Sequence, residues 1–533
     1  MDRYEYIIVG AGSAGAALAA RLAGAKKSVL LLEAGGTGHH PWVNIPLGYG
    51  KVFYDERFNW KYATEPEPEL HNRLIYWPRG KVLGGSSAIN AMVWVRGHPQ
   101  DYAEWDSVAP GWGWDDVAPV FRRIERWTGD ACAHRGADGP LSVTDVAGAM
   151  HPLTRAYVKA AEQAGIPTNT DYNGAAMTGA GFYQISTARG RRASTAQAYL
   201  TPARKLPNLR VETGAMATRI VMEGKRATGV EYMRRGKAQA AYAGEVILCG
   251  GAINTPQLMM LSGIGPAAHL RDHAIEVVQD APHVGQHLMD HLGSDHLFRT
   301  SQPSLNQVLR PWWGKALAGL QYILTQDGPL AMSLNQGGGF IRLAEGVGPP
   351  DTQLYFSPLS YSGAPAGKRP LMSPDPFPAV RIGFNPCKPT STGSITLRSA
   401  DPLAPPVMRG GYLATEHDRE LMVKGTREVR RIASMPALQS VIEAELDPGP
   451  DCVTDDEILD FARRDSWTVF HQCGTCRMGQ DAATSVVDPQ LRVHGIAGLR
   501  VADASVFPTI PTGNTNAPAV MVGERAFDLI TQG

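Results

Sequence analysis

A glycine-rich turn near the N-terminus constrains the fold of this chain more than any other feature of the sequence. Residues 4–9 form a short aromatic and β-branched run, typical of a buried strand, and an Ala/Leu-rich helical pattern extends from the turn to residue 22. A second apolar run, 28–32, ends at Glu33. Together these segments predict a strand–helix–strand unit, and therefore a parallel sheet with a helix on its face.

The turn itself reads Gly10-x-Gly12-x-x-Gly15, with Glu33 eighteen residues beyond the last glycine. The first glycine permits the tight turn, the second lets the backbone approach a pyrophosphate, and the third allows the helix to pack closely on the strand. The helix N-terminus offers free N–H groups to the phosphates, and Glu33 can accept hydrogen bonds from ribose hydroxyls. We therefore predict a dinucleotide site, although this fingerprint alone does not separate FAD from NAD.

The overall composition narrows the class of protein. The chain has 533 residues, with 51 basic and 51 acidic side chains, so its net charge gives no electrostatic footprint for nucleic acid or an anionic membrane. A hydrophobic content of 43% excludes a disordered chain. The sequence has no basic leader followed by an apolar stretch, no apolar run long enough for a spanning helix, and only six cysteines. We expect a soluble, cytoplasmic protein without an integral membrane segment, a disulfide framework or a metal.

Further along the chain the pattern alternates between strands and helices. Residues 245–249 and 499–503 read as buried strands, and 114–127 and 154–164 as helices. We expect another helix with Thr255 as its N-cap and Pro256 at its first position. Residues 35–110 are rich in Gly, Trp and Pro and predict long loops.

Between about residues 300 and 460 the pattern changes to β segments separated by Pro-rich turns, which indicates a second domain inserted between parts of the first. We predict an α/β fold: a discontinuous, Rossmann-like dinucleotide-binding domain and an α+β substrate-binding domain with an antiparallel sheet. The predicted spans are 1–155, 190–300 and 460–533 for the first domain, and 156–189 and 301–459 for the second.

Four later motifs carry a resemblance to a known family. Residues 78–90 read PRGKVLGGSSAIN and residues 251–265 read GAINTPQLMMLSGIG; His471-x-x-Gly474-Thr475-x-Arg477-Met478-Gly479 and residues 513–518 (GNTNAP) follow. In this order they resemble the two signatures and the C-terminal active-site segments of the glucose–methanol–choline (GMC) family of FAD-dependent oxidoreductases, whose members include choline dehydrogenases and alcohol oxidases. The resemblance extends from residue 4 to about residue 530.

The resemblance implies that the dinucleotide is FAD. Some family members bind FAD covalently through a histidine of the first signature, but Ile89 stands at that position here, so we expect noncovalent FAD. The positions that the family pattern assigns to the cofactor are Gly10, Gly12, Ser13, Ala14, Gly15, Glu33, Ala34, Gly84, Gly85, Asn90, Ala91, Val93, Ala217, Asp503, Ala504, Asn516 and Pro518.

His471 and Asn514 match the catalytic pair of the family. Oxidation of an alcohol removes a proton from oxygen and a hydride from the adjacent carbon, and FAD accepts the hydride at N5. Histidine suits the base because its unperturbed pKa is about 6.5. The amide of Asn514 can donate a hydrogen bond to the substrate oxygen. The resemblance therefore implies oxidation of an alcohol to the aldehyde, with His471 as the general base.

The sequence leaves two alternatives to this reaction open. Cys473 and Cys476 form a C-x-x-C pair, which could act as a redox dithiol beside the flavin, although the family motif accounts for the same segment. No second pair accompanies it, which argues against zinc. Some relatives within the family are lyases that keep FAD without redox chemistry, so a non-redox activity is the second alternative.

The substrate is less constrained than the reaction. The segment 328–340 is expected to border the substrate pocket, with Gln336 and Phe356 as candidate contacts. Choline-oxidising relatives carry a glutamate at the position of Gln336, and an uncharged side chain there argues against choline. We expect a neutral primary alcohol, aromatic or polyol-like. The sequence does not distinguish O₂ from another electron acceptor, and it does not predict the oligomeric state.

Overall fold

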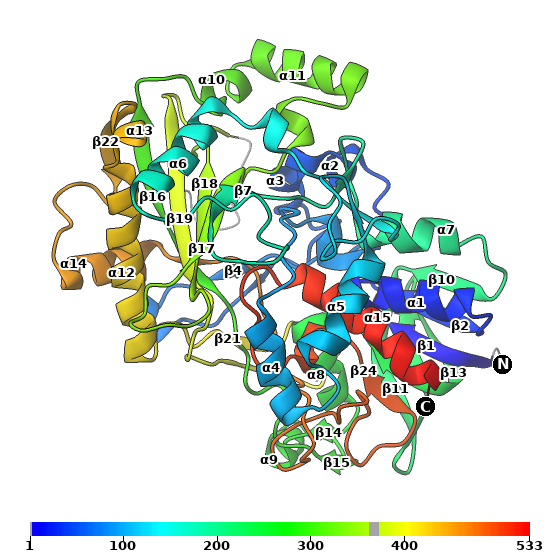
Figure 1. The fold of residues 1–533 in the computed structure, drawn as a ribbon. Coiled ribbons are helices and arrows are strands. Elements are labelled where there is room, and N and C mark those ends of the chain that lie inside the picture. The colour runs from blue at the N-terminus through cyan, green and yellow to red at the C-terminus, as the bar shows by residue number, and fades with distance from the viewer. Residues whose placement is uncertain (1–2, 362–372, 533) are drawn as a thin grey trace.

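Two sheets, each of seven strands, organise the described part of the chain. Figure 1 shows how the helices and strands are arranged. The computed structural model describes residues 3–361 and 373–532. The first sheet is mainly parallel and the second is antiparallel. The predicted fold class is therefore confirmed: a Rossmann-like unit together with an α+β unit.

The parallel part of the first sheet has the spatial order β10-β2-β1-β13-β24, which becomes 3-2-1-4-5 when these strands are renumbered along the chain. This is the order of doubly wound dinucleotide-binding folds. The strands are β1 (Arg3–Val9), β2 (Val29–Glu33), β10 (Leu209–Thr213), β13 (Lys237–Leu248) and β24 (Leu499–Val501). Strand β13 extends well before the predicted residue 245, because its first half pairs with an antiparallel hairpin, β11 (Ala215–Glu223) and β12 (Arg226–Arg234).

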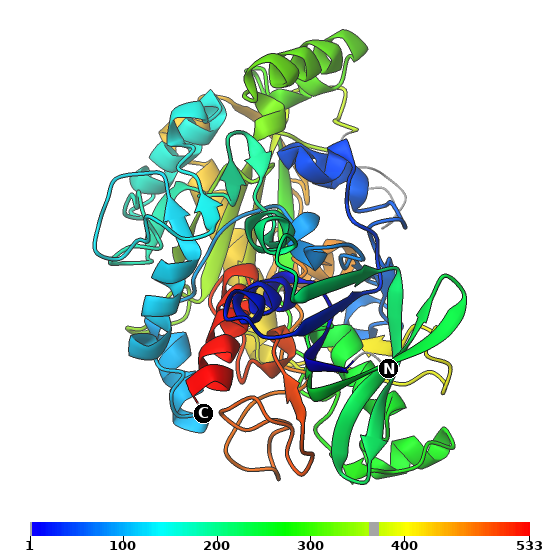
Figure 2. The ribbon, with the colours of Figure 1, turned by 90° about the vertical axis from the view of Figure 1, so that its right-hand side faces the viewer.

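The two ends of the chain meet on this sheet. Helix α1 (Ser13–Gly24) follows the glycine turn, and helix α15 (Asn516–Gln532) packs against it; Figure 2 shows the red C-terminal helix beside the blue N-terminal one. At their closest approach, a Cβ on Gly523 would lie 2.4 Å from the carbonyl oxygen of Ala14. A glycine is therefore needed where the two helix backbones touch.

The second sheet has the order β22-β16-β19-β18-β17-β7 and is flanked by α6 (Pro152–Gln163), α12 (Glu416–Ala433) and α14 (Asp455–Asp465). Strand β16 falls inside the predicted span 190–300 of the first domain, yet it pairs within this sheet. The domain boundaries stay a prediction, and the sheet favours a boundary before residue 292. The strands are β7 (Gly179–Phe182), β16 (Leu292–Thr300), β17 (Gly337–Ile341), β18 (Thr352–Ser357), β19 (Ala379–Pro386), β22 (Ile442–Asp447) and, on β16, β23 (Trp467–Thr468).

Helix α8 (Gly251–Leu261) begins earlier than predicted. The expected N-cap at Thr255 is wrong, and Pro256 lies inside the helix rather than at its start. The cap is instead supplied from a distant segment, since the Gly251 N–H donates to Asp503 Oδ2 at 2.7 Å. The carbonyl of Ala252, which would otherwise bond the N–H that Pro256 lacks, accepts the Thr475 hydroxyl at 2.6 Å.

Residues 35–110 contain long loops, as predicted, but also helix α4 (Pro99–Val108), which the prediction missed. Its N-cap is His98, an unusual residue at this position, and so the usual start signal is absent. Within the described ranges no helix has both the length and the hydropathy to cross a membrane. The other α-helices and the other strands of three or more residues in the described ranges are α2 (Pro41–Asn44), α3 (Tyr49–Val52), α5 (Trp114–Ile124), α7 (Thr201–Ala203), α9 (Ala267–Asp272), α10 (Leu305–Leu309), α11 (Trp312–Thr325), α13 (Pro436–Gln439), β5 (Glu125–Trp127), β6 (Leu141–Val143), β20 (Ser394–Thr396) and β21 (Val407–Arg409).

Candidate functional site

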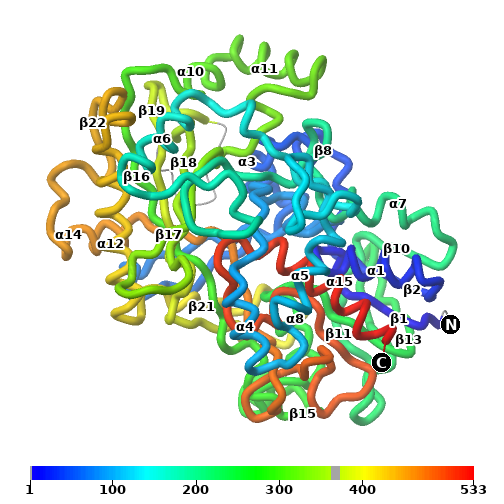
Figure 3. Tube along the Cα trace, in the orientation of Figure 1, coloured from blue at the N-terminus to red at the C-terminus, as the bar shows by residue number. Residues whose placement is uncertain are grey.

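A pocket opens at the carboxyl ends of β1, β2 and β13, against the N-terminus of α1. It encloses about 1120 Å³, part of it open to solvent. Its walls come from distant parts of the chain, from Val9 to Ala519. Figure 3 shows blue N-terminal and red C-terminal segments in the same region of the molecule. This is the position at which doubly wound sheets bind dinucleotides.

Two of the three glycines in the turn at the pocket have no space for a side chain. Gly10 has a φ of +102°, and a Cβ there would lie 2.4 Å from the carbonyl oxygen of Cys249. A Cβ on Gly15 would lie 2.0 Å from the carbonyl oxygen of Gly10. The backbone N–H groups at the start of α1 are therefore open to an anionic ligand, as a pyrophosphate requires.

Glu33 stabilises the same turn. Its carboxylate accepts the Ala11 N–H at 3.0 Å and the Gly35 N–H at 2.8 Å. Burial raises the pKa of this carboxyl to about 7, and the two backbone bonds oppose that shift. The side chain lines the pocket at the end of β2, where a ribose hydroxyl could share its remaining lone pairs.

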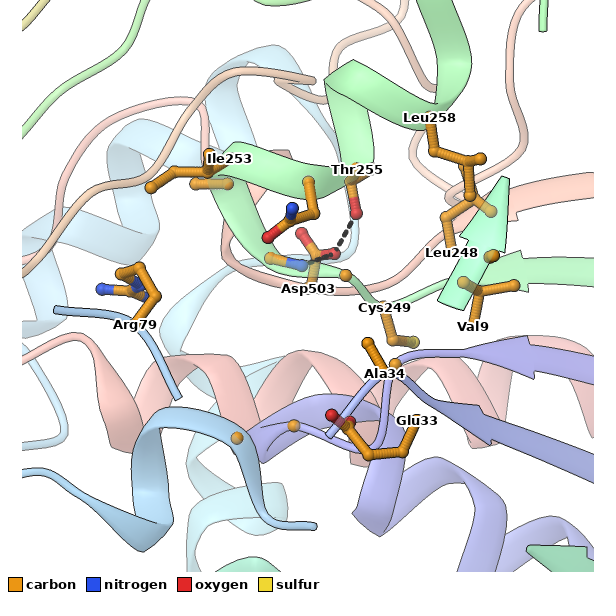
Figure 4. A pocket seen from close by; sticks show the side chains of 18 of the residues that line it. Val9, Glu33, Ala34, Arg79, Leu248, Cys249, Ile253, Thr255, Leu258 and Asp503 are labelled. Carbon is orange, nitrogen blue, oxygen red and sulfur yellow. Dashed lines mark hydrogen bonds between the residues drawn. The ribbon is translucent and has the colours of Figure 1, made fainter. Parts of the chain in front are cut away.

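The opposite part of the pocket carries Asp503 and Arg79 (Figure 4). Asp503 accepts the Thr255 hydroxyl at 2.7 Å and the Ser505 N–H at 2.8 Å, in addition to capping α8. Arg79 Nη1 donates to the Phe470 carbonyl and to Gln472 Oε1, both at 2.9 Å. Arg79 therefore connects the pocket to the segment that carries His471.

Many of the predicted cofactor residues line this pocket, but others lie outside it. Those in the lining are Gly10, Gly12, Ser13, Ala14, Glu33, Ala34, Gly85, Ala217, Asp503 and Ala504. Those outside it are Gly15, Gly84, Asn90, Ala91, Val93, Asn516 and Pro518. Trp60, Arg79 and Pro402 line the pocket without having been predicted. Arg79 belongs to the first signature, which could have identified it, whereas Trp60 and Pro402 lie in no recognised motif.

Some of the residues outside the lining have structural partners. The Gly84 N–H donates to the Ala11 carbonyl at 2.8 Å, and Asn516 Oδ1 accepts the Ser13 hydroxyl at 2.7 Å. Asn90 Oδ1 accepts Arg192 Nη1 at 2.8 Å. These contacts join the first signature and the C-terminal segment to the glycine turn or its surroundings. The cofactor roles of these residues stay a prediction.

The backbone around His471 is fixed by one buried carboxylate. Asp290 accepts the His471 N–H at 2.8 Å, the Thr468 hydroxyl at 2.5 Å, the Gln472 amide at 2.8 Å and the Tyr412 hydroxyl at 2.6 Å. Phe470, just before the histidine, has a φ of +69°, which is rare for a bulky residue. These four hydrogen bonds hold a strained turn that positions the His471 ring.

A chain of hydrogen bonds assigns the tautomer of His471. His291 Nε2 lies 2.9 Å from the Cys387 carbonyl, which can only accept, so this nitrogen carries a hydrogen. Burial lowers the pKa of His291 to about 4, so its ring is neutral near pH 7 and its Nδ1 is an acceptor. His471 Nδ1 lies 2.8 Å from that nitrogen and must donate. His471 Nε2 is therefore unprotonated.

The other side of His471 leads to the same assignment. Its Nε2 lies 3.0 Å from Asn514 Nδ2. Gln353 Nε2 donates to Asn514 Oδ1 and to the Tyr183 hydroxyl, both at 3.1 Å, and Tyr183 in turn donates to the Leu354 carbonyl. Asn514 Oδ1 is thus the acceptor and its amide donates to His471. Both ends of the network leave His471 Nε2 unprotonated, with its lone pair accepting the Asn514 amide.

The electrostatic surroundings favour the neutral ring. His471 is buried, and burial lowers its pKa well below the usual 6.5, with smaller contributions from His291 and Arg79 in the same direction. The ring is therefore present in its unprotonated form at and below neutral pH. In that form it is available to accept a proton from a substrate. The structure brings together the predicted pair, His471 and Asn514, and adds two residues that the sequence did not indicate, His291 and Gln353.

The cysteine pair and the two predicted substrate contacts have other surroundings. Cys473 and Cys476 are buried free thiols, with burial raising the pKa of both, and Cys476 Sγ lies 3.8 Å from Met259 Sδ. Gln336 Oε1 accepts the Thr154 hydroxyl and the His151 N–H, and Phe356 stacks on Tyr157 with ring centroids 4.8 Å apart. Neither Gln336 nor Phe356 lines the pocket described above.

Comparisons with known proteins agree with this architecture. The sequence model of the GMC oxidoreductase family matches residues 4–293 and 389–523. The chain is 43% identical to the oxygen-dependent choline dehydrogenase of Rhizobium etli, covering 99% of this chain and 95% of that one, and 39% identical to the alcohol dehydrogenase (acceptor) of Pseudomonas putida, covering 99% and 96%. The crystal structure of pyridoxine 4-oxidase from Mesorbium loti is 29% identical, covers 99% of both chains and superposes with a TM-score of 0.89.

Proposed function

Because the chain belongs to the GMC oxidoreductase family, FAD-dependent enzymes that oxidise CH–OH donors, we propose that it oxidises a neutral primary alcohol to the aldehyde with His471 as the general base. The observation that carries this proposal is the unprotonated Nε2 of His471, an assignment that the hydrogen-bond network supports from both ends. When bound, FAD supplies the hydride acceptor.

The residues of the pocket fit the cofactor. The glycine turn can receive a pyrophosphate, and Glu33 can meet a ribose. Arg79 is a positively charged side chain of the lining. It can neutralise part of the negative charge of the phosphates, which the carboxylates of Glu33 and Asp503 cannot do. We propose that FAD binds noncovalently, because Ile89 is buried and offers no atom for a covalent bond. Acid precipitation tests this point: the yellow colour should stay in the supernatant, and a coloured pellet would contradict it.

His471 would take the hydroxyl proton of the substrate at Nε2. The substrate hydroxyl would replace the Asn514 amide as the donor to that nitrogen, and the amide would then be free to donate to the substrate oxygen. Hydrogen bonding of this kind favours the developing alkoxide. Asp290 and His291 hold the ring in place during the transfer.

The environment of Asn514 supports an uncharged substrate. The side chains in its network are Gln353, Tyr183 and Tyr355, and none of them is ionised near neutral pH. A quaternary ammonium group would favour a carboxylate, and none of these side chains carries one. Choline is the second candidate, because several relatives that cover nearly all of this chain are choline dehydrogenases. Gln336 gives little evidence against choline, since its amide oxygen accepts hydrogen bonds from Thr154 and His151.

The decisive experiment is a kinetic comparison of the wild type with His471→Ala. General-base catalysis contributes about 10²–10⁴-fold, so we expect kcat to fall at least about 100-fold while FAD stays bound. Asn514→Ala should lose less, because the base remains. The substrates are a panel of benzylic, aliphatic and polyol alcohols together with choline, each assayed for hydrogen peroxide and with a dye acceptor. Near-normal turnover in flavin-loaded His471→Ala would refute the role of the base, and a clear preference for choline would refute a neutral substrate.

Two alternatives are tested with the same protein. Anaerobic mixing with the best alcohol should bleach the flavin band, whereas a non-redox lyase would leave it unchanged. A flavin–dithiol enzyme would need an accessible, reactive thiol, but Cys473 and Cys476 are both buried with raised pKa values. Alkylation of the reduced enzyme should therefore leave alcohol-dependent bleaching intact.

A further inference from the structure

Helix α11 exposes its large apolar side chains and buries its small ones. Trp312 is 80% exposed, Ile323 72% and Leu324 73%, whereas Gly314 and Ala318 are buried. A helix on the surface of a globular domain normally has the reverse pattern, with its apolar stripe against the core. The exposed apolar side chains of α11 therefore either contact an external partner or remain in water at a cost in solvation free energy.

The exposed apolar surface of the protein is concentrated at this one place. Seven of the thirteen exposed large apolar side chains in the described residues lie on α10 and α11, and we call these side chains the ridge. The two helices stand out from the body of the molecule in both Figure 1 and Figure 2. Scattered exposed leucines need no explanation, but a contiguous group does. The ridge consists of Val308, Trp312, Trp313, Leu317, Leu320, Ile323 and Leu324.

Positive charge surrounds the ridge. Arg310 and Lys315 are exposed on α11 and just before it, and residues 301–326 contain no Asp or Glu. At the other end of the helix, the Tyr322 hydroxyl donates to the Gly190 carbonyl at 3.0 Å, which places the exposed Arg189 and Arg191 beside it. The first acidic residue after the helix is Asp327. Although the net charge of the whole chain is zero, positive charge is therefore concentrated in this region.

We propose that the ridge binds the surface of an anionic phospholipid bilayer, with α11 lying in the interface. Tryptophan and leucine side chains on one face with nearby Lys and Arg are the combination that lies at the headgroup boundary. A protruding ridge fits a soft, planar partner better than a groove would. In a symmetric pair of chains the same patch would face itself, so the four cations of each copy would oppose those of the other. Charge therefore favours the bilayer over a second copy.

The test is sedimentation of the FAD-loaded protein with vesicles of phosphatidylcholine and phosphatidylglycerol at a 3:1 ratio, and with vesicles of phosphatidylcholine alone. We expect binding to the anionic vesicles, at least about tenfold weaker binding to the neutral ones, and weakening by added salt. The double variant Leu317→Glu/Ile323→Glu should lose at least about tenfold in partitioning. Leu403→Glu, at a residue that is 65% exposed outside the ridge, is the matched control and should bind as the wild type does.

Three outcomes would overturn the proposal. The first is that the wild type does not bind to anionic vesicles, and the second is that the ridge variant binds as well as the wild type. The third is a dimer, detected by light scattering, that the ridge substitutions abolish; this outcome would assign the ridge to a second copy of the chain. Flavin absorbance and alcohol turnover without vesicles should match the wild type in both variants. That agreement separates loss of lipid binding from misfolding, and it makes the result independent of the proposed substrate.

Discussion

At the scale of single residues, the role proposed for His471 depends on a neighbour that would take no direct part in the reaction. His291 determines which nitrogen of His471 carries the hydrogen, because its own Nε2 is committed to the Cys387 carbonyl. A base with its hydrogen on the wrong nitrogen cannot accept a proton from the substrate. In the proposed reaction His291 is thus a positioning residue, which would act on the substrate only through His471.

Replacement of His291 should separate this role from simple packing. His291→Leu removes the acceptor for His471 Nδ1–H, and we expect kcat to fall on the order of 10-fold or more, below the full contribution of a general base. Because His291 also lowers the pKa of His471, its removal should raise that pKa and move the acid limb of the kcat/KM profile to higher pH. His291→Asn, which returns an acceptor near the same position, should recover most of the rate. An unmoved acid limb in flavin-loaded His291→Leu would assign the residue a structural role only.

At the scale of elements, helix α8 shows how one distant segment makes a proline tolerable inside a helix. Thr475 donates to the carbonyl of Ala252, which has lost its intrahelical partner because Pro256 has no N–H. Thr475→Val would leave this buried carbonyl unpaired, at a cost of about 1–3 kcal/mol of unfolding free energy. Thr475→Ser keeps the hydroxyl and should cost less. Chemical denaturation of the FAD-loaded variants measures both, and equal stability of the valine variant and the wild type would contradict this account.

The same helix marks the limit of what the sequence could predict. The strand–turn–helix around Gly10 was predicted correctly because its signals are local: each glycine and Glu33 lie within one supersecondary unit. The start of α8 was predicted wrongly because its cap, Asp503, comes from a segment about 250 residues later. His291 was missed for the same reason, since it lies 180 residues from His471 and belongs to no recognised motif. Local patterns predict elements, but partners from distant segments determine their ends and their chemistry.

At the scale of the whole molecule, the second sheet carries a pH dependence of its own. His296 lies on β16 with its ring 6.1 Å from that of Phe384 and 5.6 Å from that of Phe461, and burial lowers its pKa to about 3. The folded protein therefore keeps this ring neutral well below pH 6.5, where the unfolded chain takes up a proton. Above pH 6.5 the two states bind the same number of protons. As the pH falls from 6.5 towards 3, the folded state progressively loses stability.

Replacement of His296 by leucine should remove this loss of stability at low pH. The variant has no ring to protonate on unfolding, so its stability relative to the wild type should rise by about 3 kcal/mol between pH 7.5 and pH 4.5, because two pH units below 6.5 correspond to about 2.7 kcal/mol. Denaturant unfolding of the FAD-loaded proteins at both pH values measures the change. His417→Leu, at an exposed position on α12, is the control and should follow the wild type. If His296→Leu lost as much stability on acidification as the wild type, the acid sensitivity would have to arise from other buried groups such as His291.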